Sequence, residues 1–423
     1  MKNKTLIIIS ITLVLQIIIK SFSFGQNPQW ITYNDTNSYL PSNRVYSICI
    51  DRFGNKWFGT NLNAAKFDNT NWTVYNEDNS GLPHYYISSI NIDLNGDKWF
   101  GTQLGSAKYD DTNWLVYDGS NSSFTNNCIL NISIDIDDNK WFTVYNGGVA
   151  KFDNISWSAY DTDNSDLPNN NVRSIAFDSF GNKWFGTYGG GVAKFDNINW
   201  TIYNSSNSEL PSNYVNSNII DSFDNKWIGT YNAGVARFND LTCIVYDTSN
   251  SDLPINNVFS ISIDSHGNKW FGTYGGGVAK FDDTNWTIYN TNNSGLANNK
   301  VISILIDDND NKWFGTYGGG VSVFNENGVK LSITEEFQKT TNNLTFFPNP
   351  TTSTFTLSIN DLQNKDLQIS VFNSLGNLVY SEKSKSNNEH FQKQINLGKV
   401  SKGIYLVKVI SGERVLNKKI IVE

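Results

Sequence analysis

Histidine, cysteine and methionine are almost absent from this chain of 423 residues, which contains three, three and one of them. The histidines, His84, His266 and His390, lie far apart and in unlike contexts. A zinc site needs clustered ligands, and a nucleophile–histidine pair needs a suitably placed imidazole, so the sequence supports neither. We therefore expect no catalytic residue, no metal site and no cofactor.

The few cysteines do not form a framework either. Cys49, Cys128 and Cys243 are widely separated and share no short spacing. Their odd number and wide separation favour free thiols over a disulfide or a metal site.

Basic residues are scarce in most of the chain. Residues 26–343 contain 19 Lys and Arg against 34 Asp and Glu, whereas residues 344–423 contain ten against six. Because nucleic-acid phosphates are bound by basic surfaces, the acidic main body argues against a nucleic-acid partner. Long apolar runs are missing beyond the N-terminus, so we expect no transmembrane segment in the mature chain.

Residues 1–25 have the pattern of an export signal. Lys2 and Lys4 precede an apolar run at residues 6–19, and Ser23 and Gly25 supply small residues for cleavage. This run is short for a bilayer span. We predict a cleaved signal peptide, with an uncleaved anchor as the alternative.

Aromatic residues and turn formers are what the chain has in excess. Aromatics make up 14%, including 13 Trp, and there are 32 Gly. Aromatics favour strands, while Gly, Asn and Asp favour turns, so many short strands are expected.

The tryptophans form two series with steps of about 43 residues, a period typical of repeat architectures. The first series is Trp57, Trp99, Trp141, Trp184, Trp227, Trp270 and Trp313; the second is Trp30, Trp72, Trp114, Trp157, Trp200 and Trp286, with Cys243 in place of one member.

A period of about 43 residues with four short strands is typical of a β-propeller blade. We therefore predict an all-β chain with a seven-bladed β-propeller over residues 26–327. Trp30–Tyr33 precedes the first complete unit, and the last unit has no fourth strand. Pairing this N-terminal strand with the last blade would close the ring and remove both exposed edges.

The repeated tryptophans and aspartates are interpreted as structural. A Trp at the same place in every unit is explained by packing between blades. An Asp ends the first strand of every unit, where it can accept hydrogen bonds from turn amides. Calcium binding by the Asp-rich turns at 135–139 and 307–311 is the alternative, although they lack the closing Glu of an EF-hand.

A different pattern follows a polar linker at residues 328–343. Residues 344–423 alternate apolar and polar side chains in short runs separated by turn formers. This pattern predicts a small Ig-like β-sandwich. Its strands are expected at residues 355–359, 369–373, 378–380, 403–409 and 418–422.

The two parts resemble two known families. The recurring pattern Asp-x-x-Gly-Asn-Lys-Trp-Phe-Gly-Thr-x-Gly-Gly-Gly-Val-x-x-Phe-Asp, across residues 30–325, resembles the two-component regulator propeller repeat. This resemblance implies an extracytoplasmic propeller, of the kind found in sensor kinases and in stand-alone secreted proteins. No membrane helix or kinase segment follows the propeller, so membrane signalling is not implied.

Residues 344–423 resemble the type A sorting domain of the type IX secretion system. The resemblance rests on the opening Pro348-Asn349-Pro350 and on the run that begins at Gly403-Ile404-Tyr405. It implies a partner, the type IX secretion machinery of Bacteroidetes-type bacteria, and delivery to the cell surface or the medium. An ordinary accessory sandwich that binds something is the alternative.

The units differ most where the mouth of the ring is expected. Three sets of positions should share this face. They are the residue before the first strand of each unit, the residue two places after it, and the turn between the second and third strands. Aromatic, amide and basic side chains at such a rim suit sugars or peptides. The predicted ligand-binding residues are Tyr188, Tyr231, Tyr274, Tyr317, Arg44, Tyr86, Tyr214, Lys300 and Arg173. Alternatively, these positions are unconstrained and the tyrosines fill gaps.

The leading functional hypothesis is an exported, monomeric, non-enzymatic propeller that binds a glycan, protein or peptide. An extracellular polysaccharide lyase or hydrolase is one alternative, and its first residues to consider are Tyr86, Arg173 and Tyr214. A sensor-like propeller that works with a separate signalling partner is another.

Overall fold

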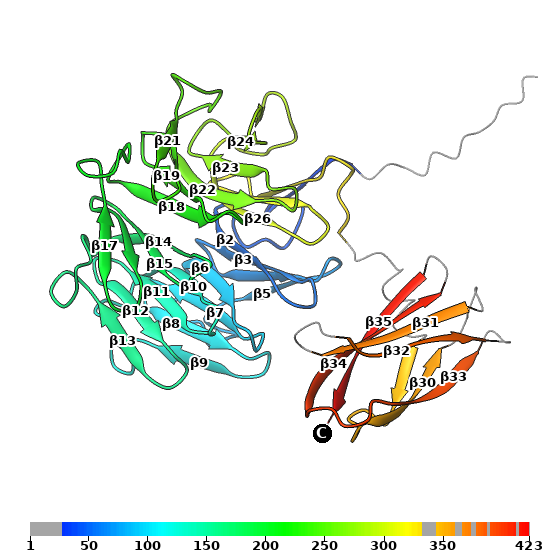
Figure 1. Cartoon of the computed structure of the whole chain (residues 1–423). Coiled ribbons are helices and arrows are strands. Elements are labelled where there is room, and N and C mark those ends of the chain that lie inside the picture. The colour runs from blue at the N-terminus through cyan, green and yellow to red at the C-terminus, as the bar shows by residue number, and fades with distance from the viewer. Residues whose placement is uncertain are drawn as a thin grey trace, which may run out of the picture.

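A computed structural model describes residues 28–331, 344–359, 366–373, 378–386, 390–411 and 414–422. The predicted signal peptide and most of the predicted linker lie outside these residues. All of the elements within them are strands (Figure 1). No helix in this part of the chain is long and apolar enough to cross a bilayer.

Residues 45–289 form six sheets, each built from four consecutive antiparallel strands. Each sheet is a blade, and its first strand lies innermost in the ring (Figure 1). The six blades are β2 (Val45–Ile50), β3 (Lys56–Thr60), β4 (Ala64–Phe67), β5 (Trp72–Tyr75); β6 (Ile87–Ile92), β7 (Lys98–Thr102), β8 (Gly105–Tyr109), β9 (Trp114–Tyr117); β10 (Ile129–Ile134), β11 (Lys140–Val144), β12 (Gly148–Phe152), β13 (Trp157–Tyr160); β14 (Val172–Phe177), β15 (Lys183–Thr187), β16 (Gly191–Phe195), β17 (Trp200–Tyr203); β18 (Val215–Ile220), β19 (Lys226–Thr230), β20 (Val235–Phe238), β21 (Cys243–Tyr246); β22 (Val258–Ile263), β23 (Lys269–Thr273), β24 (Val278–Phe281) and β25 (Trp286–Tyr289).

The seventh blade closes the ring with the N-terminal strand. Its own strands are β26 (Val301–Ile306), β27 (Lys312–Thr316) and β28 (Val321–Phe324), and β1 (Trp30–Tyr33) adds the fourth. β1 pairs with β28 in antiparallel register from Trp30 opposite Phe324 to Tyr33 opposite Val321. The predicted closed, seven-bladed ring is confirmed.

Every inner strand carries a β-bulge at the same place. In β14, Val172 pairs with Thr187 and Ser174 pairs with Gly186, which leaves Arg173 as the extra residue. The same shift of register occurs in the other six blades. A bulge redirects a side chain, so each blade has one inner-strand residue free to differ from its ladder neighbours. The bulged residues are Tyr46, Ser88, Leu130, Arg173, Asn216, Phe259 and Ile302.

Each repeated Trp is held by the repeated Asp of its own blade. Trp184 is buried and its Nε1 donates to Oδ2 of Asp178 at 2.9 Å. Oδ1 of Asp178 accepts the backbone N–H groups of Phe180 and Asn182, which shapes the hairpin turn. The equivalent Trp–Asp bond occurs in all seven blades. These aspartates are therefore structural, as predicted.

A buried lysine links each blade to the one before it. Lys226 is 3% exposed, and its Nζ lies 4.6 Å from the ring centroid of Trp184 in the preceding blade. The same contact recurs around the ring and closes with Lys56 over Trp313 at 5.2 Å. A desolvated cation over an indole face contributes about 2 kcal/mol. The repeated Lys-Trp pair is therefore a joint between blades.

The turn between the second and third strands needs glycine in some blades. Gly191 has a φ of +84°, and a Cβ there would lie 2.2 Å from the carbonyl oxygen of Tyr203. An L-residue would therefore be strained both by its backbone and by contact with the fourth strand. Tyr188 is the first residue of this turn.

Packing of the propeller continues a few residues past 327. Val329 is buried, and its N–H donates to the carbonyl of Pro28 at 2.9 Å. The N–H of Lys330 donates to Oδ1 of Asn311 at 3.2 Å. The first residues of the predicted linker are thus part of the propeller's seventh-blade packing.

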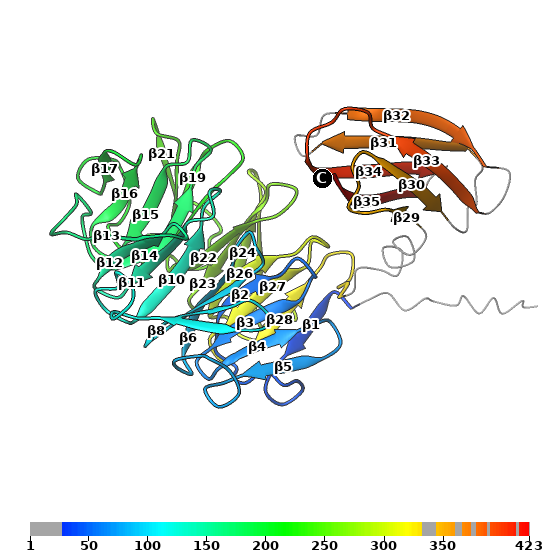
Figure 2. The same ribbon diagram turned by 90° about the horizontal axis from the view of Figure 1, so that it is seen from below.

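The C-terminal region has two sheets around one core, in agreement with the predicted sandwich (Figure 2). One sheet has the order β29–β30–β33 and the other β32–β31–β34–β35. β29 and β33 were not predicted. The strands are β29 (Leu344–Phe347), β30 (Thr354–Ile359), β31 (Asp366–Asn373), β32 (Leu378–Lys385), β33 (Phe391–Asn396), β34 (Gly403–Ser411) and β35 (Arg414–Val422).

Candidate ligand-binding rim

One mouth of the propeller is bordered by a ring of backbone contacts between neighbouring blades. The N–H of Tyr188 donates to the carbonyl of Asn171 in its own blade at 2.8 Å. Tyr188 also forms an isolated antiparallel bridge with Tyr214 of the next blade. Equivalent bridges join Tyr274 to Lys300 and Tyr317 to Arg44. We call this border, with the bulged residues beside it, the rim.

Two rim cations lie against tyrosine rings where the seventh blade meets its two neighbours, the sixth and the first. Cζ of Arg44 lies 4.6 Å from the ring centroid of Tyr317. Nζ of Lys300 lies 4.7 Å from the ring of Tyr274 and 5.9 Å from that of Tyr317. The rings of Tyr274 and Tyr317 are 5.9 Å apart. These four side chains form one cluster, the Arg44 cluster.

Two further tyrosines extend the Arg44 cluster into the first and second blades. Tyr46, a bulged residue, lies 4.9 Å from Tyr86 and 6.3 Å from Tyr317 between ring centroids. Burial raises the pKa of Tyr86, and hydrogen bonding with Tyr46 raises it further. Tyr86 therefore stays protonated at neutral pH, whereas a tyrosine acting as a general base needs its pKa lowered.

A second cluster lies in the fourth and fifth blades. Cζ of the bulged Arg173 lies 5.0 Å from the ring of Tyr188. Tyr188 packs edge-on against Tyr214 at 5.0 Å and against Tyr231 at 6.0 Å. Tyr214 is 48% exposed and Tyr231 is 39% exposed, so a ligand can reach this Arg173 cluster.

All nine predicted rim residues thus belong to one of two clusters. Arg44, Tyr86, Tyr274, Lys300 and Tyr317 lie in the first, and Arg173, Tyr188, Tyr214 and Tyr231 in the second. The prediction omitted Tyr46 and Phe259, whose ring lies 5.0 Å from Tyr274. Both are bulged residues, as is Arg173, so their shared position in the repeat was the signal for including them.

The histidines of the propeller have supporting roles in the structure. His84 is half-buried beside the rim, where its ring stacks on Tyr85 at 4.2 Å and its Nδ1 accepts the N–H of Tyr86 at 3.0 Å. His266 is 72% exposed in a hairpin turn.

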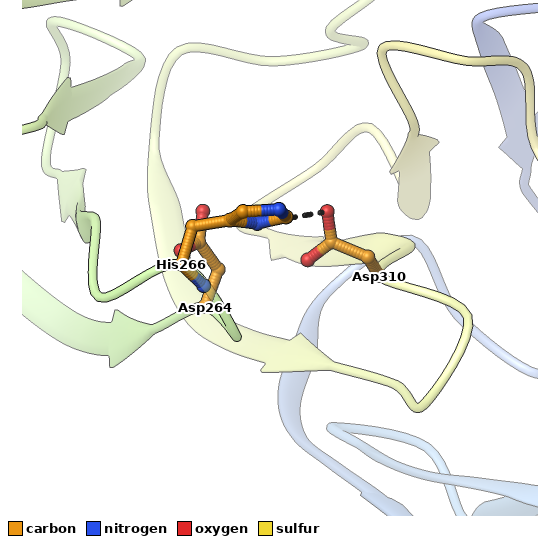
Figure 3. Close-up of side chains that lie close together, drawn as sticks. All are labelled: Asp264, His266 and Asp310. Atoms are coloured by element: carbon orange, nitrogen blue, oxygen red, sulfur yellow. Dashed lines mark hydrogen bonds and ion pairs between the residues drawn. The ribbon is translucent and has the colours of Figure 1, made fainter.

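His266 lies with two aspartates in the one group of possible metal ligands found among the described residues (Figure 3). Its Nδ1 is 4.0 Å from Oδ2 of Asp310 in the next blade. The third member, Asp264, already accepts four hydrogen bonds: from the backbone of His266, from the backbone and side chain of Asn268, and from Trp270. A carboxylate has about four acceptor positions, so Asp264 has none left for a metal.

The fold and rim together define a closed β-propeller with a mixed aromatic and cationic mouth, followed by a β-sandwich region. Residues 345–423 match the secretion system C-terminal sorting domain family. Residues 39–62 and 166–189 match the two component regulator propeller family. The chain carries two-component regulator propeller repeats and a C-terminal type IX sorting domain, which confirms both resemblances. The sorting domain implies interaction with the secretion machinery and export past the outer membrane.

Solved structures share the fold. The extracellular domain of the hybrid two component system BT3049 from B. thetaiotaomicron aligns with a TM-score of 0.63 at 23% identity, over 93% of this chain and 57% of that one. PorZ, a surface component of the type-IX secretion system of Porphyromonas gingivalis, aligns with a TM-score of 0.57 at 16% identity, over 93% and 60%. This chain therefore spans less than two thirds of either protein.

A propeller enzyme also shares the fold. Virginiamycin B lyase from Staphylococcus aureus aligns with a TM-score of 0.57 at 15% identity, over 70% of this chain and 97% of that one. At such identities the likeness establishes architecture alone. No curated protein matches the chain.

Proposed function

We propose that the mature protein is a non-enzymatic binding propeller that acts at the cell surface or outside the cell. It is delivered by a cleaved signal peptide and by residues 344–423, and it binds a glycan, protein or peptide ligand at the rim. The observation that carries the proposal is the pair of clusters in which Arg44, Lys300 and Arg173 rest on tyrosine rings. Such groups offer stacking surfaces and polar contacts in one place.

The polar groups of the rim also support binding. Within the described residues, no side-chain hydrogen bond engages the phenol oxygens of Tyr188, Tyr214, Tyr231 and Tyr274. These phenols are available to a ligand's hydroxyl groups, and the partly exposed rings can stack on a sugar face. A surface of this kind suits recognition better than bond cleavage.

An extracellular lyase or hydrolase is the second candidate, and the shared fold with virginiamycin B lyase is what favours it. The sequence points to three residues for this enzyme alternative. Arg173 and Tyr214 both lie against Tyr188, whereas Tyr86 lies in the other cluster. The raised pKa of Tyr86 makes it a poor base. The sensor alternative rests on the shared fold with the BT3049 domain.

The proposal is tested with a glycan and peptide array. The full chain is compared with the triple variant Tyr188→Ala/Tyr274→Ala/Tyr317→Ala, and with Tyr39→Ala as a control, because Tyr39 is 75% exposed and outside the rim. We expect binding by the wild type and the control, and its loss in the triple variant. Unchanged binding by a folded triple variant, or depolymerisation of a bound polysaccharide, would overturn the proposal.

A further inference from the structure

The rim has positive charge and no negative charge of its own. The residues before the inner strands, the bulged residues, and the turns between second and third strands include Arg44, Arg173 and Lys300 but no Asp or Glu. Yet residues 26–343 carry 34 acidic against 19 basic residues. Local positive charge in an acidic molecule raises the local concentration of anions.

The three rim cations also have no ion-pair partner within the described residues. Arg44 is exposed, and the Nε of Arg173 is buried without a hydrogen-bond partner. Their close contacts are with the faces of tyrosine rings. An aromatic face holds a cation in place while leaving its N–H groups free to donate.

The buried cations of the propeller differ from the rim cations in their contacts. The buried lysines of the second strands each reach a carboxylate or amide oxygen; Lys226, for example, lies 2.8 Å from Asp240, and Lys183 donates to Asn197 at 2.6 Å. Burial of a cation without such a partner is costly. The rim cations therefore differ from the buried second-strand lysines. They resemble third-strand cations such as Lys66 and Lys194, which also lie against an aromatic ring and have no ion-pair partner among the described residues.

We propose that the rim ligand is an acidic saccharide, whose carboxylate or sulfate groups are bound by Arg44 with Lys300, and by Arg173. The inference rests on the proposed function and names the ligand class. A saccharide is favoured over an acidic peptide because each cation lies against at least one tyrosine ring, and the rings of the two clusters can stack on a sugar face while the cation holds the charged substituent.

The test compares matched charged and neutral probes on the full chain. The probes are oligogalacturonate, its methyl ester, a heparin-derived oligosaccharide and poly-glutamate. The variant is Arg44→Gln/Lys300→Gln, and the control is Arg52→Gln/Lys66→Gln, which removes two cations that lie against Phe53 and Trp57, away from the rim. Circular dichroism and urea denaturation check that both variants fold.

We expect at least one acidic saccharide to bind the wild type, and the rim variant to bind it at least about tenfold more weakly, which corresponds to about 1.4 kcal/mol. The control should bind as the wild type does. If the rim recognises a carboxylate, oligogalacturonate should bind better than its methyl ester. If the rim recognises a sulfate, the heparin probe should bind better than both.

Three results would overturn the inference: no acidic saccharide binds, the rim variant and the control weaken binding equally, or poly-glutamate binds more tightly than every saccharide. Failure of the ligand class is distinguishable from failure of the proposed function. If neutral sugars bind the wild type and the tyrosine triple variant loses them, the rim still binds ligands, and only its preference for anions is wrong.

Discussion

Nζ of Lys226 lies 4.6 Å from the ring centroid of Trp184, which belongs to the preceding blade. Lys226 also pairs with Asp240 of its own blade at 2.8 Å. One buried cation thus joins two neighbouring sheets. Because this joint recurs around a closed ring, the propeller depends on it for stability rather than for recognition.

Replacing Lys226 with Met should therefore destabilise the propeller. Met keeps most of the apolar volume but loses the cation, so we expect a loss of about 2 kcal/mol in the free energy of unfolding. Urea denaturation measures it. The comparison is Lys66→Met, whose Nζ lies 5.5 Å from Trp57 but whose side chain is only half-buried. Equal effects of the two substitutions would contradict a special role for the buried lysine.

Closure by the N-terminal strand gives a second prediction. Trp30 stacks on Phe324 at 4.5 Å and contacts Phe314 at 6.0 Å, so it joins the first strand to the last blade. Trp30→Ala should lower the free energy of unfolding by about 3 kcal/mol. Tyr39→Ala, at an exposed site, should change it by less than about 0.5 kcal/mol. A Trp30→Ala protein as stable as the control would argue that the ring does not need its closing strand.

Acid should destabilise the propeller through the repeated aspartates. Burial alone would raise the pKa of Asp178, but hydrogen bonds from Trp184 and Asn182 lower it overall. Asp51, Asp221 and Asp264 are shifted in the same direction. An Asp in the unfolded chain has a pKa of about 3.9, so the stabilisation is present above about pH 4 and is lost as the pH falls through the lower folded-state pKa.

The urea midpoint should accordingly decrease from about pH 6 to about pH 3. Asp178→Asn, which removes one titrating group, should be less stable at neutral pH and show a shallower decrease. A midpoint that stays level or increases on acidification would show that these carboxylates do not stabilise the fold.

Export should depend on residues 344–423. Removing them should leave the propeller in the periplasm, and their fusion to a folded carrier should direct that carrier past the outer membrane. Cell fractionation with immunoblotting measures both. Normal export of the truncated chain would contradict the assignment of the sorting role.

The repeat made the propeller predictable, because two tryptophan series with one period define both the strands and the number of blades. The buried lysines were not predicted. A lysine is normally expected in solvent, and the partner ring of Lys226 lies in another blade, 42 residues away at Trp184. The strand β33 was missed because its sequence, Phe-Gln-Lys-Gln-Ile-Asn, is mostly polar.

The rim was predictable in position but not in contacts. The order of the strands within a blade places two features on the same face of the ring: the turn that contains Tyr188 and, in another blade, the residue Arg44 before the inner strand. Which ring each cation contacts depends on the bulge that redirects Arg173 and Tyr46, and a shift of register has no local signature in one strand. Whether a rim cation has an ion-pair partner likewise depends on the residues of all the blades around it, so one repeat does not show it.

The most direct test of ligand binding at the rim is hydrogen–deuterium exchange of the full chain, with and without a saturating ligand from the array. Binding at the rim should slow exchange at the amides of Tyr188, Tyr231, Tyr274 and Tyr317, whose N–H groups border the mouth. Exchange in the hairpins that follow the inner strands, such as residues 178–182, should stay unchanged. Protection confined to those hairpins, with none at the four tyrosines, would contradict the account.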